Sequence, residues 1–323
     1  MPLRTPICDL FGIELPVFLA GMGEVAFAEV VAAVSEAGGY GTLGMGASPP
    51  ERIRDQMRRV RALTKKPFGV DMLAALPDHV NAAIDVIIGE GASCFVAGLG
   101  VPAPIIEKCH RAGVKVMVVC GKVSHAVASE NAGCDAVVAQ GTEAGGHTGL
   151  VAGMALIPQT VDAVSIPVLA AGAIVDGRGL AAALAFGAQG VWMGTRFIAS
   201  EEARASRLYK ERILKLGSAD TRITRCYSGK PMRVLDNAYA QGWETRSAEI
   251  RPFPAQMAIS TRDGVFNFTD DRLADPERTC MPAGQGVGGI DEILPAREIV
   301  ERVVAEAEEV LGDLGRLAVA GSR

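Results

Sequence analysis

The chain has 323 residues, of which 49% are hydrophobic and 21% charged, and its formal net charge is −5 at pH 7. This composition is typical of a protein with a large apolar core, and the length fits one α/β barrel with additions. The small negative charge and the lack of a long single-sign run disfavour nucleic-acid and anionic-membrane partners. No run of about 18 apolar residues predicts a membrane-spanning helix.

The cysteines and the N-terminus favour a cytoplasmic location. The 7 cysteines form no Cys-x-x-Cys pair and mostly lie in apolar runs, as Cys94 and Cys134 do, which is typical of buried, reduced thiols. The first residues lack the apolar region of a signal peptide. Because the 4 histidines do not combine with Cys or carboxylates at zinc spacing, we expect no metal site.

Short apolar runs alternate with longer amphipathic segments over the first 200 residues. Eight runs are continuous blocks, as in strands buried on both faces: 16–20, 41–44, 67–72, 94–97, 114–119, 136–139, 167–171 and 190–193. Helical patterns follow at 25–37, 50–63, 78–89, 104–112, 124–132, 158–164 and 179–186, and several end at a glycine: Gly38, Gly89, Gly113, Gly133 and Gly187. Eight such units predict a (β/α)₈ TIM barrel, with a doubly wound sheet as the alternative.

The alternation stops after about residue 197. A helix is predicted over 201–216, and a proline- and charge-bearing region follows to about Cys280. Apolar residues then recur at helical spacing over 299–311, which predicts a closing helix. We therefore expect a barrel over 1–200, a lid or cap over 201–282 and a C-terminal segment, 283–323, that returns to the barrel. Tyr239 and Trp243 of the lid are candidate substrate contacts.

Two glycine-rich loops follow the seventh and eighth predicted strands. They are AGAIVDGRG at 171–179 and MGTRF at 193–197. Glycine lets backbone N–H groups approach an anion, and barrel phosphate sites are commonly built from these two loops. Arg178 and Arg196 flank the loops, so either is a candidate phosphate partner, and Arg196 is equally a candidate for pairing with a buried acid. A third segment, AGQGVGG at 283–289, is read as a ligand contact or as a turn.

His147 lies in the segment AQGTEAGGHTG, 139–149, directly after the sixth predicted strand. The carboxyl ends of barrel strands form the active-site face, and an imidazole there exchanges protons near neutral pH. A purely structural histidine that hydrogen-bonds its loop is the alternative. Glu143 is expected to support the loop by capping a backbone N–H or by orienting His147. The other histidines, His79, His110 and His125, are expected at the surface.

These segments together resemble the nitronate monooxygenase (2-nitropropane dioxygenase) family of FMN-dependent barrels. The resemblance covers nearly the whole chain and rests on Gly21-Met22, on PFGV at 67–70, on AQGTEAGGHTG, on both glycine loops and on AGQGVG at 283–288. The flavin-dependent enoyl-acyl-carrier-protein reductases carry a very similar Glu-Ala-Gly-Gly-His element. Membership of this group therefore leaves the reaction open.

The resemblance implies non-covalently bound FMN and assigns its contacts. The phosphate would lie on Gly172, Ala173, Gly194 and Thr195, and the flavin ring would face His147. The remaining implied cofactor residues are Gly21, Met22, Asp71, Gln140, Gly145, Gly146 and Gln285. Three positions depart from related sequences: Leu19, where relatives often carry Gln; Glu24, where Trp is common; and Asp71, where Asn is common. Cys120 is the thiol expected nearest to the flavin.

The resemblance leaves two enzymatic functions open. The first is oxidation of alkyl nitronates with O₂ to carbonyl compounds and nitrite, with His147 as the catalytic proton acceptor. The second is an NAD(P)H-dependent reductase acting on an enoyl thioester or a quinone. A non-catalytic binding or scaffold protein on the same barrel is a third alternative, which the complete glycine loops disfavour. A homodimer is one open arrangement, since barrels with a lid often dimerise.

Overall fold

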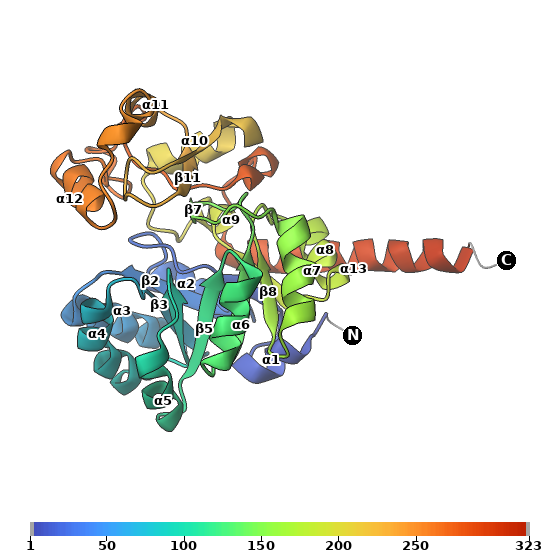
Figure 1. Ribbon diagram of the computed structural model, residues 1–323. Helices are drawn as coiled ribbons and strands as arrows, with labels where there is room; N and C mark the ends of the chain where they lie inside the picture. The colour runs from blue at the N-terminus through green and yellow to red at the C-terminus, as the bar shows by residue number, and fades with distance from the viewer. Residues whose placement is uncertain (1–2, 321–323) are drawn as a thin grey trace.

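Eight parallel strands form the central sheet of the protein. The structure is a computed structural model that describes residues 3–320, and side chains over 3–317. The strand order is β1-β9-β8-β6-β5-β4-β3-β2, and an isolated parallel bridge between Phe18 and Tyr40 joins the two ends into a barrel. This confirms the predicted (β/α)₈ fold (Figure 1). The strands are β1 (Val17–Leu19), β2 (Gly41–Gly46), β3 (Phe68–Leu73), β4 (Cys94–Gly98), β5 (Lys115–Cys120), β6 (Ala136–Gln140), β8 (Val168–Ala171) and β9 (Gly190–Met193).

Helices follow these strands where the sequence predicts them. They are α2 (Ala28–Glu36), α3 (Pro50–Leu63), α4 (Pro77–Gly89), α5 (Ala103–Arg111), α6 (Val123–Asn131), α7 (Gly153–Ala163), α8 (Gly177–Ala185) and the short α9 (Thr195–Ile198). One predicted boundary is wrong, and another is confirmed. Helix α7 begins five residues before Pro158, because the Glu143 carboxylate accepts from the Gly153 N–H at its start. Helix α4 ends at Gly89, as predicted, and Gly91 takes the left-handed conformation after it.

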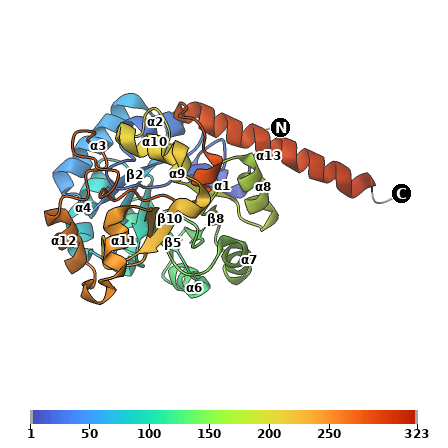
Figure 2. The same ribbon diagram turned by 90° about the horizontal axis from the view of Figure 1, so that it is seen from above.

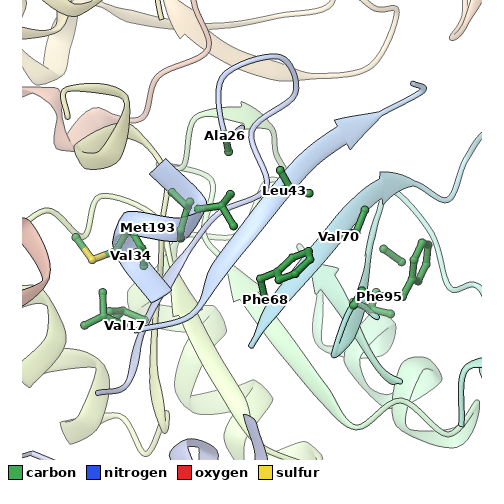
Figure 3. Packing of buried hydrophobic residues seen from close by; sticks show 14 of the residues in the cluster. Val17, Ala26, Val34, Leu43, Phe68, Val70, Phe95 and Met193 are labelled. Atoms are coloured by element: carbon green, nitrogen blue, oxygen red, sulfur yellow. The ribbon is translucent and has the colours of Figure 1, made fainter. Parts of the chain in front are cut away.

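Alternate residues of each strand face two different cores, as a closed sheet requires. In β4, Phe95 and Ala97 pack outward against the helices, whereas Cys94 and Val96 face the barrel interior. Figure 3 shows the outer core around β1, β2 and β3. The end of the barrel opposite the lid is closed by α1 (Pro6–Phe11), whose Phe11 ring meets Phe18 and Tyr40 at 5.1 and 5.0 Å.

The segment after α9 forms a cap over the carboxyl ends of the strands (Figure 1). It contains α10 (Arg207–Lys215), η1 (Ser218–Asp220), β10 (Thr221–Thr224), β11 (Met232–Leu235), α11 (Ala238–Glu244), η2 (Ser247–Glu249) and α12 (Ala255–Arg262). The helix predicted from residue 201 begins later, because the Ser206 hydroxyl caps α10 by accepting from the Tyr209 N–H. Strand β11 pairs antiparallel with β10 and with β7 (Gly146–His147). The cap is therefore hydrogen-bonded to the His147 segment itself.

The chain returns to the barrel through η3 (Gln285–Gly289) and α13 (Ala296–Ala320). The first half of α13 buries Ile299, Val300 and Val303 in the outer core, where the helix packs on α8 and α2. The predicted closing helix is therefore present, but it is longer than the apolar pattern indicated. Its second half extends past α8 and away from the barrel in both views (Figure 2), and Leu314 and Leu317 are exposed there.

Candidate active site

A cavity of about 1000 Å³ lies between the carboxyl ends of the strands and the cap. This volume is at the upper end of the range for small-molecule and cofactor sites. Apart from Gln285, every residue predicted to bind cofactor or to act in catalysis lines it: Gly21, Met22, Asp71, Gln140, Gly145, Gly146, His147, Gly172, Ala173, Gly194 and Thr195. The structure thus brings together residues from the carboxyl ends of five strands, β1, β3, β6, β8 and β9.

The segment after β6 is held from three sides. The Gln140 side-chain amide donates to the His147 carbonyl at 2.7 Å, which folds the segment back on its own strand. Glu143 accepts from the start of α7, so its expected supporting role as a backbone cap is confirmed. A Cβ added to Gly145 would lie 2.7 to 2.8 Å from the backbone of Ala283 and Gly284. Glycine is therefore required where this segment meets the one before η3.

His147 is held by the cap and is half-buried. Its Nε2 lies 2.8 Å from the Ser228 hydroxyl, which also donates to the Lys230 carbonyl at 3.2 Å. Because the single hydroxyl proton of Ser228 is used there, this arrangement favours the tautomer with the proton on Nε2 and a free lone pair on Nδ1. Burial, and then the positive charge of Lys230, lowers the pKa of the imidazole to about 4. His147 is therefore neutral at neutral pH.

The two glycine loops lie side by side at the ends of β8 and β9. Gly172 and Ala173 have φ of +114° and +52°, a conformation that turns the backbone sharply after the strand. Thr195 accepts from the Gly284 N–H at 3.0 Å, which ties the second loop to the third glycine segment. The side chain of Gln285 is outside the cavity lining, whereas Gly284 and Gly286 are part of it. The cofactor contact expected of Gln285 therefore stays a prediction, while its two glycine neighbours reach the cavity.

Two of the three departures change the charge pattern near the cavity. Asp71, at the end of β3, has no hydrogen bond or ion pair within residues 3–317, and burial raises the pKa of its carboxyl well above the usual value. A Cβ on Gly21 would lie 2.2 Å from the Asp71 Cβ, so this glycine makes room for the acid. Glu24 is paired with Arg52 and lies 3.7 Å from Arg204. Leu19 is fully buried in the outer core.

The arginines beside the glycine loops have structural partners. Arg178 is exposed and pairs with Asp176, the residue that caps α8. Arg196 is buried and donates to the carbonyls of Ala199 and Glu292. Neither lines the cavity. The expectation that one of them neutralises a phosphate is therefore unsupported, and the partners of Arg196 are carbonyls, not a buried acid.

Other candidates are also placed by the structure. Cys120 packs in the core, is absent from the cavity lining, and burial raises its thiol pKa to about 11. Tyr239 and Trp243 pack within the cap, away from the cavity. Trp192 is buried and touches the cavity floor. Among the remaining histidines, His79 is exposed, His110 pairs with Asp135 at 2.9 Å, and His125 lies exposed at the cavity edge.

Sequence reasoning missed the turn between β10 and β11 as part of the site. Ser228 and Lys230 of this turn both line the cavity, and Phe253 lies with its ring edge-on to His147 at 6.4 Å. The available signal was the SGKP segment, 228–231, between two apolar runs, which is typical of a hairpin turn. Its distance of 81 residues from His147 hid the contact.

The fold and the cavity define a class of protein. A parallel barrel with paired glycine loops at the ends of β8 and β9, a large cavity and a neutral histidine is typical of a barrel oxidoreductase with a bound nucleotide cofactor. The sequence profile described as nitronate monooxygenase matches residues 4–86 and 79–306. The chain belongs to the nitronate monooxygenase family and is a flavin-dependent oxidoreductase.

Similar proteins include members with different names. A probable nitronate monooxygenase of Staphylococcus saprophyticus is 32% identical, over 96% of this chain and 99% of that protein. A Rhodococcus jostii protein is 34% identical, over 98% of this chain and 99% of that protein. It is named (3aS,4S,5R,7aS)-5-hydroxy-7a-methyl-1-oxo-octahydro-1H-indene-4-carboxyl-CoA dehydrogenase.

Two solved structures also match over nearly the whole chain. FabK from Thermotoga maritima has a TM-score of 0.91, with 38% identity over 97% of this chain and 99% of that chain. A nitroalkane oxidase from Streptomyces ansochromogenes has a TM-score of 0.86, with 30% identity over 95% of this chain and 99% of that chain. Both agree with the barrel and cap described above.

Among residues 3–317 there is no group of three or more His, Cys, Asp or Glu side chains placed to hold a metal ion. No helix within residues 3–320 is long and apolar enough to cross a membrane.

Proposed function

We propose that the protein binds FMN and oxidises alkyl nitronates with O₂ to carbonyl compounds and nitrite. The observation that carries this proposal is the neutral His147, half-buried in the cavity wall and fixed through Nε2 by Ser228. The cavity fits a flavin mononucleotide in size, its walls are mainly apolar strand ends, and its glycine loops leave backbone N–H groups free to approach a phosphate. When bound, the flavin supplies electron transfer.

The chain's own residues would divide the remaining tasks. The loops with Gly172, Ala173, Gly194 and Thr195 would hold the phosphate, and Asp71 and Gln140 would approach the ring. His147 would take the α-proton of a neutral nitroalkane, since its neutral form has a free lone pair at all pH values well above 4. A nitronate, which has already lost that proton, would bypass this step. The cap would exclude water from the reacting carbon.

An anaerobic titration of the purified yellow protein tests the proposal. We expect propionate 3-nitronate alone to bleach the flavin band at about 450 nm, a range typical of oxidised flavins. The His147→Ala variant should keep its flavin and lose turnover of neutral nitroalkanes, whereas the exposed control His79→Ala should keep both. Flavin that stays oxidised with the nitronate would refute nitronate oxidation.

A second function has its own support. The Rhodococcus relative is named as a dehydrogenase of a carboxyl-CoA compound, and its identity is 34%, against 32% for the staphylococcal relative. An NAD(P)H-dependent reductase acting on an enoyl thioester or a quinone would use the same cavity, with His147 steadying the substrate carbonyl. Bleaching of the flavin by NADH or NADPH, without bleaching by the nitronate, would favour this function.

A further inference from the structure

The charges around the cavity leave a local positive excess, although the whole chain carries a net −5. Glu24 is neutralised by Arg52 and Arg204, and burial, which disfavours the charged form, raises the pKa of the Asp71 carboxyl well above its usual value. Lys230 also lines the cavity, and its ammonium has no carboxylate within 4.0 Å among residues 3–317. An ammonium without a counter-ion beside a binding cavity attracts anionic ligands.

Lys230 is held at a defined position by the turn that carries it. Gly229 has a φ of +88°, and a Cβ there would lie 2.5 Å from the Arg251 carbonyl and the Phe253 nitrogen. The turn therefore packs closely on the segment 251–253. As a result the Lys230 ammonium lies over the Phe253 ring, 5.0 Å from its centre. This cation–π contact restricts a side chain that would otherwise sample many rotamers.

The turn that carries Lys230 also contacts the His147 segment. Ser228 contacts the imidazole at 2.8 Å, and the Thr148 N–H donates to the Pro231 carbonyl at 3.2 Å. The positive charge of Lys230 is close enough to depress the pKa of His147. A ligand within reach of the imidazole is therefore also within the field of the ammonium.

We propose that Lys230 is the anion-recognition residue of this site, and that it selects substrates with a carboxylate near the reacting carbon. This inference rests on the proposed function for the identity of the reacting group, but not for the anion contact itself. On this view a nitronate that also carries a carboxylate is a better substrate than a plain alkyl nitronate. Lys230 would bind a small anion. That anion can be the nitronate group itself or a separate carboxylate of the substrate.

A pair of unreactive ligands tests the contact without turnover. Propionate and propionamide have nearly the same shape and differ in charge, and their binding to the holoenzyme can be followed by flavin difference spectra. We expect propionate to bind about tenfold more tightly, the size of one charge-assisted hydrogen bond partly open to water. The Lys230→Met variant, which keeps most of the side-chain length, should lose this preference.

Two matched variants make the result decisive. Lys215→Met removes an exposed lysine of α10 that lies 4.0 Å from Glu211, so it should keep the preference. Lys122→Met removes the other lysine that lines the cavity. The proposal is overturned if wild type binds both ligands equally or neither, if Lys230→Met retains the preference, or if Lys122→Met alone abolishes it.

Turnover separates this proposal from the proposed function. In wild type, kcat/KM should be higher for propionate 3-nitronate than for ethyl nitronate, and Lys230→Met should reduce this ratio through KM. An equal ratio of kcat/KM for the two nitronates in wild type and in Lys230→Met would contradict selection by Lys230. If neither nitronate is oxidised, nitronate oxidation fails, while the propionate measurement still decides whether Lys230 binds an anion.

Discussion

The burial of His147 makes the stability of the protein depend on pH in a predictable direction. Its pKa is about 4 in the folded chain, against an ordinary value of 6.5. The folded state therefore keeps the imidazole neutral in a range where the unfolded chain already binds a proton. Stability from this group is fully present above about pH 6.5, and it is lost progressively as pH falls toward the folded pKa.

The size of the effect follows from proton linkage. With pKa values of 6.5 and about 4, His147 alone should lower the free energy of unfolding by about 2 kcal/mol between pH 8 and pH 5. The assay is urea unfolding at the two pH values, followed by tryptophan fluorescence. Other groups titrate in the same range, so the wild type is compared with His147→Gln, which cannot take up the proton.

The quantity to compare is the change in the free energy of unfolding between pH 8 and pH 5, in wild type and in His147→Gln. The His147→Gln variant should lose about 2 kcal/mol less than wild type on going from pH 8 to pH 5. The absolute stability of the variant also reflects its lost bond to Ser228, but that loss is present at both pH values and cancels. An equal pH dependence in the two proteins would show that the imidazole is solvated like an ordinary histidine, and the reasoning on its neutral form would fail.

Two further substitutions test the cavity walls. Gly145→Ala should lower Tm by about 2 to 5 °C, because its Cβ would lie 2.7 Å from backbone at Ala283, an overpacking cost of about 1 to 3 kcal/mol; Gly89→Ala, with nothing within 4 Å of its Cβ, is the control, and equal Tm shifts would refute the close approach. Asp71→Asn should raise Tm at pH 8, with a gain that shrinks toward pH 4, since burial raises the pKa of Asp71 and folding must otherwise keep its carboxyl protonated. A gain independent of pH would show that ionisation of this carboxyl is not the cause.

The barrel and its cavity were predictable because their signals are local. Each strand is a continuous apolar run, and each helix has its own periodic pattern, so a window of ten residues is enough to find either. The carboxyl ends of parallel strands then meet at one face by topology alone. Gly172 and Gly194 were placed together in this way, whereas Gly21 and Asp71 were assigned to the site by the family resemblance.

The contribution of the cap was not predictable by the same means. Ser228 reaches His147 through pairing of β11 with the two-residue strand β7, and such long-range pairing leaves no periodic signal near either residue. Helix boundaries failed for a similar reason. The start of α7 is fixed by the Glu143 carboxylate, ten residues earlier in the chain.

The division between barrel and cap also bears on specificity. The glycine loops that would hold a cofactor come from the barrel, whereas Ser228, Lys230 and Phe253, which surround His147, come from the cap. Substitutions in the cap can change the charge and shape around the reacting carbon while the barrel contacts stay intact. Relatives that share this barrel and carry different names are expected on this basis. The turn between β10 and β11, not the glycine loops, is therefore where substrate preference in this chain should be sought.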